Sequence, residues 1–314
     1  MKIMIAGGLG YIGSAMCELY KNQPQHEVVV VDKKFIPERV ANFPPHFQYF
    51  QADIRDIDVM RYLLHGVDVL HMLAAEVEAE KSIHKERAVW EHNFEAPKRL
   101  IENCPSAVRV MFPSTGNVFG GINESQKFMD LTEEDEPKPK YPYAETKRAM
   151  EKFLLGSGRN FTIARFGTNY GYAPGIRFNL VTNIFTKRML LGEDLVIHGG
   201  GENWRPTVCV WDCARALEFL STRQDAQGEI FHVVRNSYQI KELAKKIISY
   251  GNSKSNLRFI AKEVPFNSYA LSSAKIKSLG FNFEWDLERA VKHLIQVFHM
   301  MMPISQLASS DGGE

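Results

Sequence analysis

The first thirteen residues, MKIMIAGGLGYIG, constrain the fold of this chain more than any other stretch. Residues 3–5 form an apolar run typical of a buried parallel strand, and glycines follow at positions 7, 8, 10 and 13. Such a turn lets backbone N–H groups approach a pyrophosphate at the positive end of the next helix. Glycine-rich stretches are common, however, so the turn alone is weak support for a cofactor.

The next unit strengthens this interpretation. Residues 28–31 are four valines that predict a second buried strand, which ends in Asp32, 19 residues after Gly13. At this spacing a carboxylate reaches the adenosine ribose hydroxyls of NAD. Strand, glycine turn, helix, strand and acid occur in order, so we predict an NAD site. Lys33 and Lys34 leave room for NADP, although Asp32 would repel its 2′-phosphate.

Composition limits the class of protein. The 314 residues are 45% hydrophobic and 24% charged, which allows a substantial core, and the net charge of +1 argues against nucleic acid or an anionic membrane as main partner. No apolar run approaches the ~20 residues of a membrane helix. The four cysteines lack zinc-ligand spacing, so we expect free thiols and no metal. With a core strand at the start and no signal peptide, we expect a cytoplasmic protein.

Apolar runs alternate with helical patterns through the first half, which predicts an α/β fold: a Rossmann-like, doubly wound parallel sheet with a smaller C-terminal α/β substrate lobe. We place the cofactor domain at 1–165, with a return at about 205–234, and the lobe at 166–204 and 235–302, before a flexible tail at 303–314. The predicted strands are 3–5, 28–32, 47–53, 67–73, 109–113 and 228–234. The predicted helices are 14–23, 84–103, 143–155, 179–191, 213–221, 240–250 and 287–302.

Further cofactor contacts are expected where these strands end. Asp53 follows a strand and could bond the adenine amino group, which we favour, or cap a helix at 55–65. The small residues Ala74 and Ala75, after Leu73, could pack over a dinucleotide or reflect tight packing alone. The expected cofactor-binding residues are Gly7, Gly10, Tyr11, Ile12, Gly13, Asp32, Asp53, Ile54, Leu73, Ala74, Ala75, Tyr143 and Lys147.

Two segments carry the predicted chemistry. Ser114 and Thr115 lie just past a predicted strand, and Tyr143 and Lys147 are four apart, on one face of a helix. A tyrosine hydroxyl has a pKa near ~10, and a neighbouring ammonium lowers this pKa by favouring the phenolate. The phenolate can then take a proton from a substrate alcohol while hydride leaves the same carbon. A Tyr-x-x-x-Lys pair alone is typical of a solvated helix face, so its position after the nucleotide-binding half carries the argument.

In this order, the glycine turn, Asp32, Asp53, Leu73-Ala74-Ala75, Ser114-Thr115 and Tyr143-x-x-x-Lys147 resemble the extended short-chain dehydrogenase/reductases, and among them the NAD-dependent epimerase/dehydratase group that acts on nucleotide sugars. The resemblance implies that Tyr143 is the acid/base and that Lys147 modifies its pKa and binds the nicotinamide ribose. It implies that Thr115, with Ser114 beside it, bonds the reacting sugar oxygen, and that Asn93 braces the active-site backbone.

Departures from the family pattern narrow the reaction. The 4,6-dehydratases carry an acid pair after the threonine, whereas this chain has Gly116 and Asn117, and the cysteine that some epimerase/reductases place at position 116 is absent. Of the reactions known in this family, those at a single alcohol of the sugar remain. We therefore predict a 4-epimerase that works through a transient 4-keto sugar. The alternatives are a 4-dehydrogenase or 4-ketoreductase and, from another class, a non-catalytic NAD-sensing protein.

The second half resembles the family's substrate lobe. The resemblance implies that Thr168 or Asn169 contacts the substrate and that Arg205 grips its diphosphate, although an arginine expected near Asn267 is absent. Arg177 is a second phosphate candidate, and Asp212 is expected to cap the helix at 213–221. We also expect a homodimer through the helices that carry the apolar residues Trp90, Phe94, Phe153 and Leu154, for which burial in the internal core is the alternative.

Overall fold

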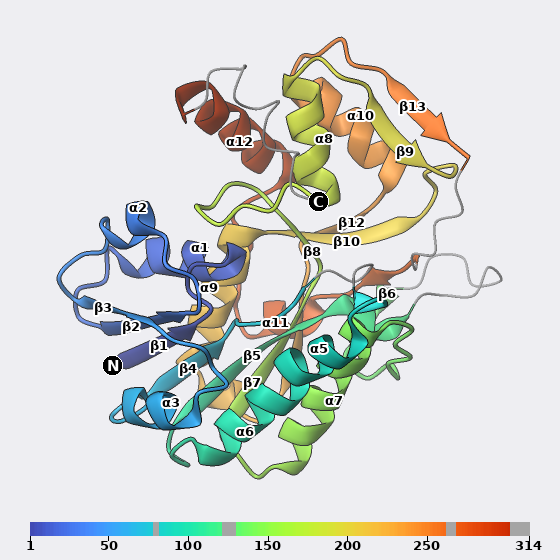
Figure 1. Cartoon of the computed structure of the whole chain (residues 1–314). Helices are drawn as coiled ribbons and strands as arrows, with labels where there is room; N and C mark the ends of the chain where they lie inside the picture. The colour runs from blue at the N-terminus through green and yellow to red at the C-terminus, as the bar shows by residue number, and fades with distance from the viewer. Residues whose placement is uncertain (78–81, 121–129, 262–267, 302–314) are drawn as a thin grey trace.

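The computed structural model describes residues 1–77, 82–120, 130–261 and 268–301 (Figure 1). Its main sheet has the strand order β11-β7-β5-β4-β1-β2-β3, and every neighbouring pair is parallel. The connections reverse direction between β1 and β4, where parallel α/β sheets bind their ligands. The strands are β1 (Lys2–Ala6), β2 (Glu27–Asp32), β3 (Phe47–Gln51), β4 (Val69–Met72), β5 (Arg109–Thr115), β7 (Phe161–Phe166) and β11 (Ile230–Val233).

Helices cover both faces of this sheet, which confirms the predicted doubly wound α/β class. One core cluster joins the sheet to α1 (Tyr11–Tyr20), α9 (Val210–Ser221) and α11 (Ala274–Ser278). A second cluster lies on the other face, against α3 (Ile57–Leu63), α6 (Ala96–Asn103) and α7 (Pro142–Gly156). The shorter elements are α2 (Pro37–Val40), α5 (Glu86–Trp90), the π-helical η1 (Glu91–Glu95) and the 3₁₀ turns η2 (Gly116–Phe119) and η3 (Gln224–Ala226).

Most of the remaining elements build a smaller lobe, whose helices α8, α10 and α12 lie together at the top of Figure 1, whereas β6 lies below them. Strands β8 and β10 pair in parallel and β12 pairs antiparallel with β10, while β9 pairs with β13 and β6 with β14. The strands are β6 (Asp130–Leu131), β8 (Thr168–Tyr170), β9 (Leu195–His198), β10 (Trp204–Cys209), β12 (Asn236–Gln239), β13 (Leu257–Ile260) and β14 (Ala270–Leu271). The helices are α8 (Val181–Leu190), α10 (Ile240–Tyr250) and α12 (Leu287–Met301).

Several predicted boundaries were wrong for local reasons. Helix α1 begins three residues earlier than predicted, because Gly10 is its extended N-cap, and it ends at Tyr20. The helix predicted at 84–103 is interrupted by a π-helical turn over Glu91–Glu95. Strand β5 continues through Thr115, so both predicted hydroxyls lie inside the strand rather than past it. The predicted tail at 303–314 and Asn267 lie outside the described residues.

Two side-chain predictions were also wrong. Leu154 is fully buried in the core between α7 and the sheet, so it cannot contribute to a dimer surface. Asp212 does not cap α9, whose N-cap is Cys209; its carboxylate instead accepts bonds from the backbone N–H groups of Glu284 and Trp285, each at 3.0 Å. This contact anchors the chain that leads into α12. The four cysteines are free and buried, as predicted.

Within the described ranges, no helix is both long and apolar enough to cross a lipid bilayer.

Candidate active site

A cleft of about 650 Å³ opens beyond the carboxyl ends of β1, β2, β4 and β5. The glycines predicted for the cofactor turn are sterically required here. Gly7 has φ +90°, and a Cβ on it would lie 2.6 Å from the backbone nitrogen of Ala74. A Cβ on Gly13 would lie 2.2 Å from the Gly7 carbonyl oxygen. No side chain caps the N-terminus of α1, so its first amides are available for a pyrophosphate. The backbone therefore fits a dinucleotide.

The carboxylate of Asp32 is held at the end of β2 beside this turn. One oxygen accepts a bond from the Leu9 N–H and the other from the Lys34 N–H, both at 3.0 Å. Asp53 also lines the cleft, but it does not cap the following helix, because Asp56 is the N-cap of α3 and accepts from Val59 N–H at 3.3 Å. The alternative of a helix cap is thereby excluded, and the favoured adenine contact stays a prediction. Asp53 pairs instead with Arg55, which holds the pKa of this carboxyl below its usual value.

Every residue predicted to bind the cofactor lines this one cleft. Asn93, on the π-helical turn, braces the chain after β4: its amide donates to the Glu76 carbonyl and accepts from the Glu76 N–H, both at 2.8 Å. The π turn thus directs an amide side chain toward the backbone beside the cofactor crevice. This arrangement agrees with the bracing role that the family resemblance implies for Asn93.

Tyr143 and Lys147 face the cleft from α7, opposite Thr115 at the end of β5. Burial raises the pKa of Tyr143, whereas the Arg177 charge and a hydrogen bond with the Thr115 side chain act to lower it. The predicted influence of Lys147 on this hydroxyl stays a prediction. The site thus holds a tyrosine, a threonine and a cation within reach of one another.

Lys147 is only 4% exposed, and its amine donates to the Pro113 carbonyl at 2.8 Å. It also lies 4.6 Å from the centre of the Phe112 ring. Burial lowers the pKa of Lys147 to about 8, and the Glu151 carboxylate acts in the opposite direction. A lysine in this environment changes charge near neutral pH much more readily than one in water.

Ser114 differs from Thr115 in what its hydroxyl contacts. It lines the cleft, but its Oγ donates to Glu151 Oε1 at 2.6 Å, whereas Thr115 Oγ1 accepts from the Asn117 N–H at 3.2 Å. The Ser114 hydroxyl therefore binds a buried carboxylate, whereas the Thr115 hydroxyl lies beside Tyr143.

Of the predicted substrate contacts, Thr168, Asn169 and Arg177 line the cleft, and Arg205 does not. Arg205 lies beside Tyr269 and Tyr141, which support its charge, while burial lowers its pKa. The family signature that singled out Arg205 carries no information about this packing. Its diphosphate role stays a prediction.

Sequence reasoning missed two residues of the site. Tyr269 lines the cleft and donates its hydroxyl to Asn117 Oδ1 at 2.8 Å, and Asn183 lies buried beneath the segment that carries Arg177. Tyr269 is 152 residues from Asn117 and Asn183 is 172 residues from its partner Tyr11, so no local spacing could have indicated these contacts. A Cβ on Gly116 would lie 2.7 Å from Leu271 Cδ1 and 3.1 Å from Tyr269 Cε2, so Tyr269 and Leu271 fill the space beside this glycine.

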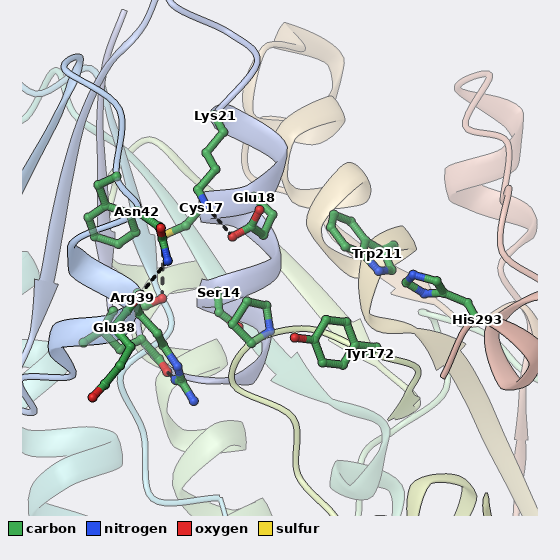
Figure 2. Close-up of a pocket in the computed structure, with 14 residues that line it drawn as sticks. Ser14, Cys17, Glu18, Lys21, Glu38, Arg39, Asn42, Tyr172, Trp211 and His293 are labelled. Carbon is green, nitrogen blue, oxygen red and sulfur yellow. Dashed lines mark hydrogen bonds and ion pairs between the residues drawn. The ribbon is translucent and has the colours of Figure 1, made fainter. Parts of the chain in front are cut away.

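A second cavity, of about 550 Å³, lies beside α1 and is lined by its residues Ser14, Cys17, Glu18 and Lys21 (Figure 2). Figure 2 shows Tyr172 and Ser14 at its floor, with Trp211 and His293 at one side and Arg39 at the other. Leu9 and Arg39 line both cavities, so only a thin wall separates them. In the described parts of the chain, no cluster of three or more His, Cys, Asp or Glu side chains could hold a metal ion.

Comparisons with known proteins agree with a cleft that fits a dinucleotide. A family model described as "NAD dependent epimerase/dehydratase family" matches residues 3–233. The chain is 26% identical over 311 residues to the Arabidopsis thaliana trifunctional UDP-glucose 4,6-dehydratase/UDP-4-keto-6-deoxy-D-glucose 3,5-epimerase/UDP-4-keto-L-rhamnose-reductase. The matched region covers 92% of this chain and 46% of the relative. It thus spans about half the length of that relative.

Other relatives match over nearly their whole length. The chain is 28% identical over 299 residues to a Bacillus subtilis protein named as an uncharacterized UDP-glucose epimerase, with 88% of this chain and 91% of the relative covered. Among solved structures, it is similar to a double mutant of a dTDP-glucose 4,6-dehydratase from Streptomyces venezuelae with NAD and DAU bound. That similarity has a TM-score of 0.83 at 26% identity and covers 97% of this chain and 100% of the other.

The tight packing around Gly13 predicts that a single added methyl group strongly weakens NAD binding. Replacing Gly13 with alanine forces apart α1 and the turn, because the new Cβ meets backbone rather than a flexible side chain. At ~2–3 kcal/mol for such overpacking, NAD should bind roughly 100-fold more weakly in calorimetric titration. The matched control is Gly156→Ala, where a Cβ meets nothing within 4 Å. Equal NAD affinity in the two variants would contradict this account of the cradle.

The buried lysine predicts a pH-dependent stability. Because the pKa of Lys147 falls from 10.5 to about 8 on folding, the unfolded chain holds the extra proton between these values. The free energy of unfolding therefore rises with pH through this window. Relative to Lys147→Met, the cofactor-free wild type should gain on the order of 1–3 kcal/mol between pH 8 and about 10 in urea titrations. The control Lys152→Met, an exposed position on the same helix, should follow the wild type. A constant difference between wild type and Lys147→Met would refute the depressed pKa.

Proposed function

The chain belongs to the NAD dependent epimerase/dehydratase family, as its motifs predict, and we propose that it is an NAD-dependent nucleotide-sugar 4-epimerase working through a transient 4-keto sugar. The family is NAD dependent, which confirms the predicted cofactor. One observation carries the proposal: Tyr143, Thr115 and Lys147 meet in the same cleft as the glycine cradle, at the carboxyl end of the sheet. In this proposal the main domain holds NAD and the smaller lobe holds the sugar nucleotide.

The residues of the cleft have separate roles in this proposal. When bound, NAD would supply an acceptor for the hydride of the sugar C4, and its reduced form would supply the donor that restores this hydride to the keto carbon. Tyr143 takes the proton of the reacting alcohol and gives it back, and Thr115 orients the sugar oxygen by a hydrogen bond. Burial raises the pKa of Tyr143, and the Arg177 charge opposes this rise. Lys147, anchored on Pro113, presents an ammonium for the nicotinamide ribose.

In this proposal, the substrate is recognised by the side of the cleft that β8 and the segment after it form. Thr168 and Asn169, on β8, provide polar side chains, and Arg177 provides a guanidinium whose fork matches two phosphate oxygens. We assign the nucleoside diphosphate to this side. The absence of acids at Gly116 and Asn117 supports chemistry at one alcohol rather than loss of water, because neither residue can move a proton.

A Tyr143→Phe variant tests the catalytic assignment. It removes the proton acceptor and keeps the ring, so turnover should fall by roughly 10²–10⁴-fold while NAD affinity stays near that of the wild type. The assay mixes enzyme and NAD with UDP-, dTDP-, GDP- and CDP-sugars and follows the C4 configuration by NMR and NADH by absorbance. The matched control is Tyr141→Phe, two residues earlier and outside the residues that line the cleft.

Each outcome of this assay separates the alternatives. Inversion at C4 without net NADH supports the epimerase, whereas accumulating NADH indicates a 4-dehydrogenase. In a parallel assay supplied with NADH and a 4-keto sugar nucleotide, consumption of NADH indicates a 4-ketoreductase. NAD binding without turnover of any sugar nucleotide would indicate an NAD-sensing protein. Equal turnover by wild type and Tyr143→Phe would remove Tyr143 from the reaction.

We also propose a homodimer through α5, η1 and α7, which pack against each other. Trp90, Phe94 and Phe153 are partly exposed on these elements, and Leu155 is 49% exposed. Light scattering should give about twice the chain mass of 35.8 kDa. Phe153→Glu should halve that mass, because it buries a charge in the interface, whereas Phe259→Glu on β13 should leave it unchanged. A monomeric wild type would exclude the pairing.

A further inference from the structure

A short segment of the lobe, residues 171–177, runs between the two cavities, and we call it the strap. Tyr172 and Pro174 line the cavity of Figure 2, whereas Gly175 and Arg177 line the main cleft. In the middle of the strap, Ala173 and Ile176 pack against the hydrophobic core. Polar contacts hold its two ends.

Two of these contacts, one at each end of the strap, meet at Asn183, a fully buried residue of α8. Its Oδ1 accepts from the Gly171 N–H at 3.1 Å, and its Nδ2 donates to the Arg177 carbonyl at 3.0 Å. The same Nδ2 donates to the hydroxyl of Tyr11, also at 3.0 Å. One amide side chain therefore holds both ends of the strap and uses both of its N–H groups to do so.

Tyr11 belongs to the cofactor turn, one residue after Gly10, and its hydroxyl donates to the Gly171 carbonyl. Two further contacts tie the strap to the same turn. Ser14 Oγ accepts from the Gly175 N–H at 2.8 Å, and a Cβ on Gly175 would lie 2.4 Å from the Gly10 carbonyl oxygen. The strap thus rests directly on the backbone that is shaped for a pyrophosphate.

We propose that Asn183 is a positioning residue that couples the two halves of the cleft, so that NAD on the glycine turn fixes the strap and places Arg177 for the substrate diphosphate. This inference rests on the proposed function. Phosphate oxygens on the amides of α1 hold Tyr11, and Tyr11 and Asn183 together hold Gly171 and Arg177. The sugar nucleotide then meets an arginine that has already been ordered, and by reciprocity it strengthens the binding of NAD.

Calorimetry measures this coupling directly. UDP, dTDP, GDP and CDP are titrated into the full chain with and without saturating NAD, and the diphosphate that binds most tightly serves as the probe. In the wild type, NAD should raise the affinity for the probe about tenfold, within the range usual for coupled sites. The factor should fall below about twofold in Tyr11→Phe, which loses only the hydroxyl, and in Asn183→Asp, which cannot donate to Arg177.

The matched control is Thr182→Val, on the same turn of α8. Thr182 Oγ1 is buried and, among the described residues, has no hydrogen-bond partner, so its removal breaks no contact of the strap. This variant should keep the tenfold factor, and thermal melting with NAD shows that each variant is folded. A purely structural Asn183 would change the melting temperature but not the ratio of the two affinities.

The outcomes distinguish this inference from the proposed function. A wild-type factor near one, or a tenfold factor that survives in Tyr11→Phe, overturns the coupling even though both ligands bind. Loss of the factor in Thr182→Val would also overturn it, because Asn183 would then not be specific. If neither NAD nor any of the four diphosphates binds the wild type, the proposed function itself is wrong.

Discussion

A single buried carboxylate, Glu151, holds together the parts of the molecule that carry the chemistry. It has no exposed surface and accepts bonds from Ser114 on β5 at 2.6 Å and from Arg165 on β7 at 2.9 and 2.8 Å. Arg148, one turn earlier on α7, adds a contact at 3.0 Å. A charge at this depth is tolerated only with partners, and loss of one partner from such a pair typically costs about 3–5 kcal/mol. The position of α7 on the sheet, and of Tyr143 and Lys147 with it, therefore depends on this network.

The same network explains how neighbouring residues take different roles. Ser114 and Thr115 are adjacent in β5, so their side chains point to opposite sides of the strand. Glu151 takes the Ser114 hydroxyl into the interior, and Thr115 is left beside Tyr143. Glu151 also follows Lys147 by one helical turn, and its charge opposes the effect of burial on that amine. One carboxylate thus helps to set both the geometry and the electrostatics of the site.

The features that could be predicted from the sequence are those that local geometry determines. The valines of β2 and the glycines of the first turn predict strand and cradle because their spacing is a property of a short backbone segment. Tyr143 and Lys147 share a face because they are one helical turn apart. Leu154 was misjudged because helical spacing shows which residues share a face but not whether that face meets the sheet. Ser114 has a partner 37 residues away, and no local pattern encodes that distance.

Non-local packing also shapes the wall of the cleft. Beside Gly116, the position where the family resemblance places an acid of the dehydratases, the space is filled by Tyr269 and Leu271 from the C-terminal part of the chain. The Tyr269 hydroxyl is bound to Asn117, and burial raises its pKa, so this wall stays neutral at physiological pH. A neutral wall can bond sugar hydroxyls but cannot supply the acid and base that elimination requires. Under the proposed function, this arrangement leaves proton transfer in the cleft to Tyr143.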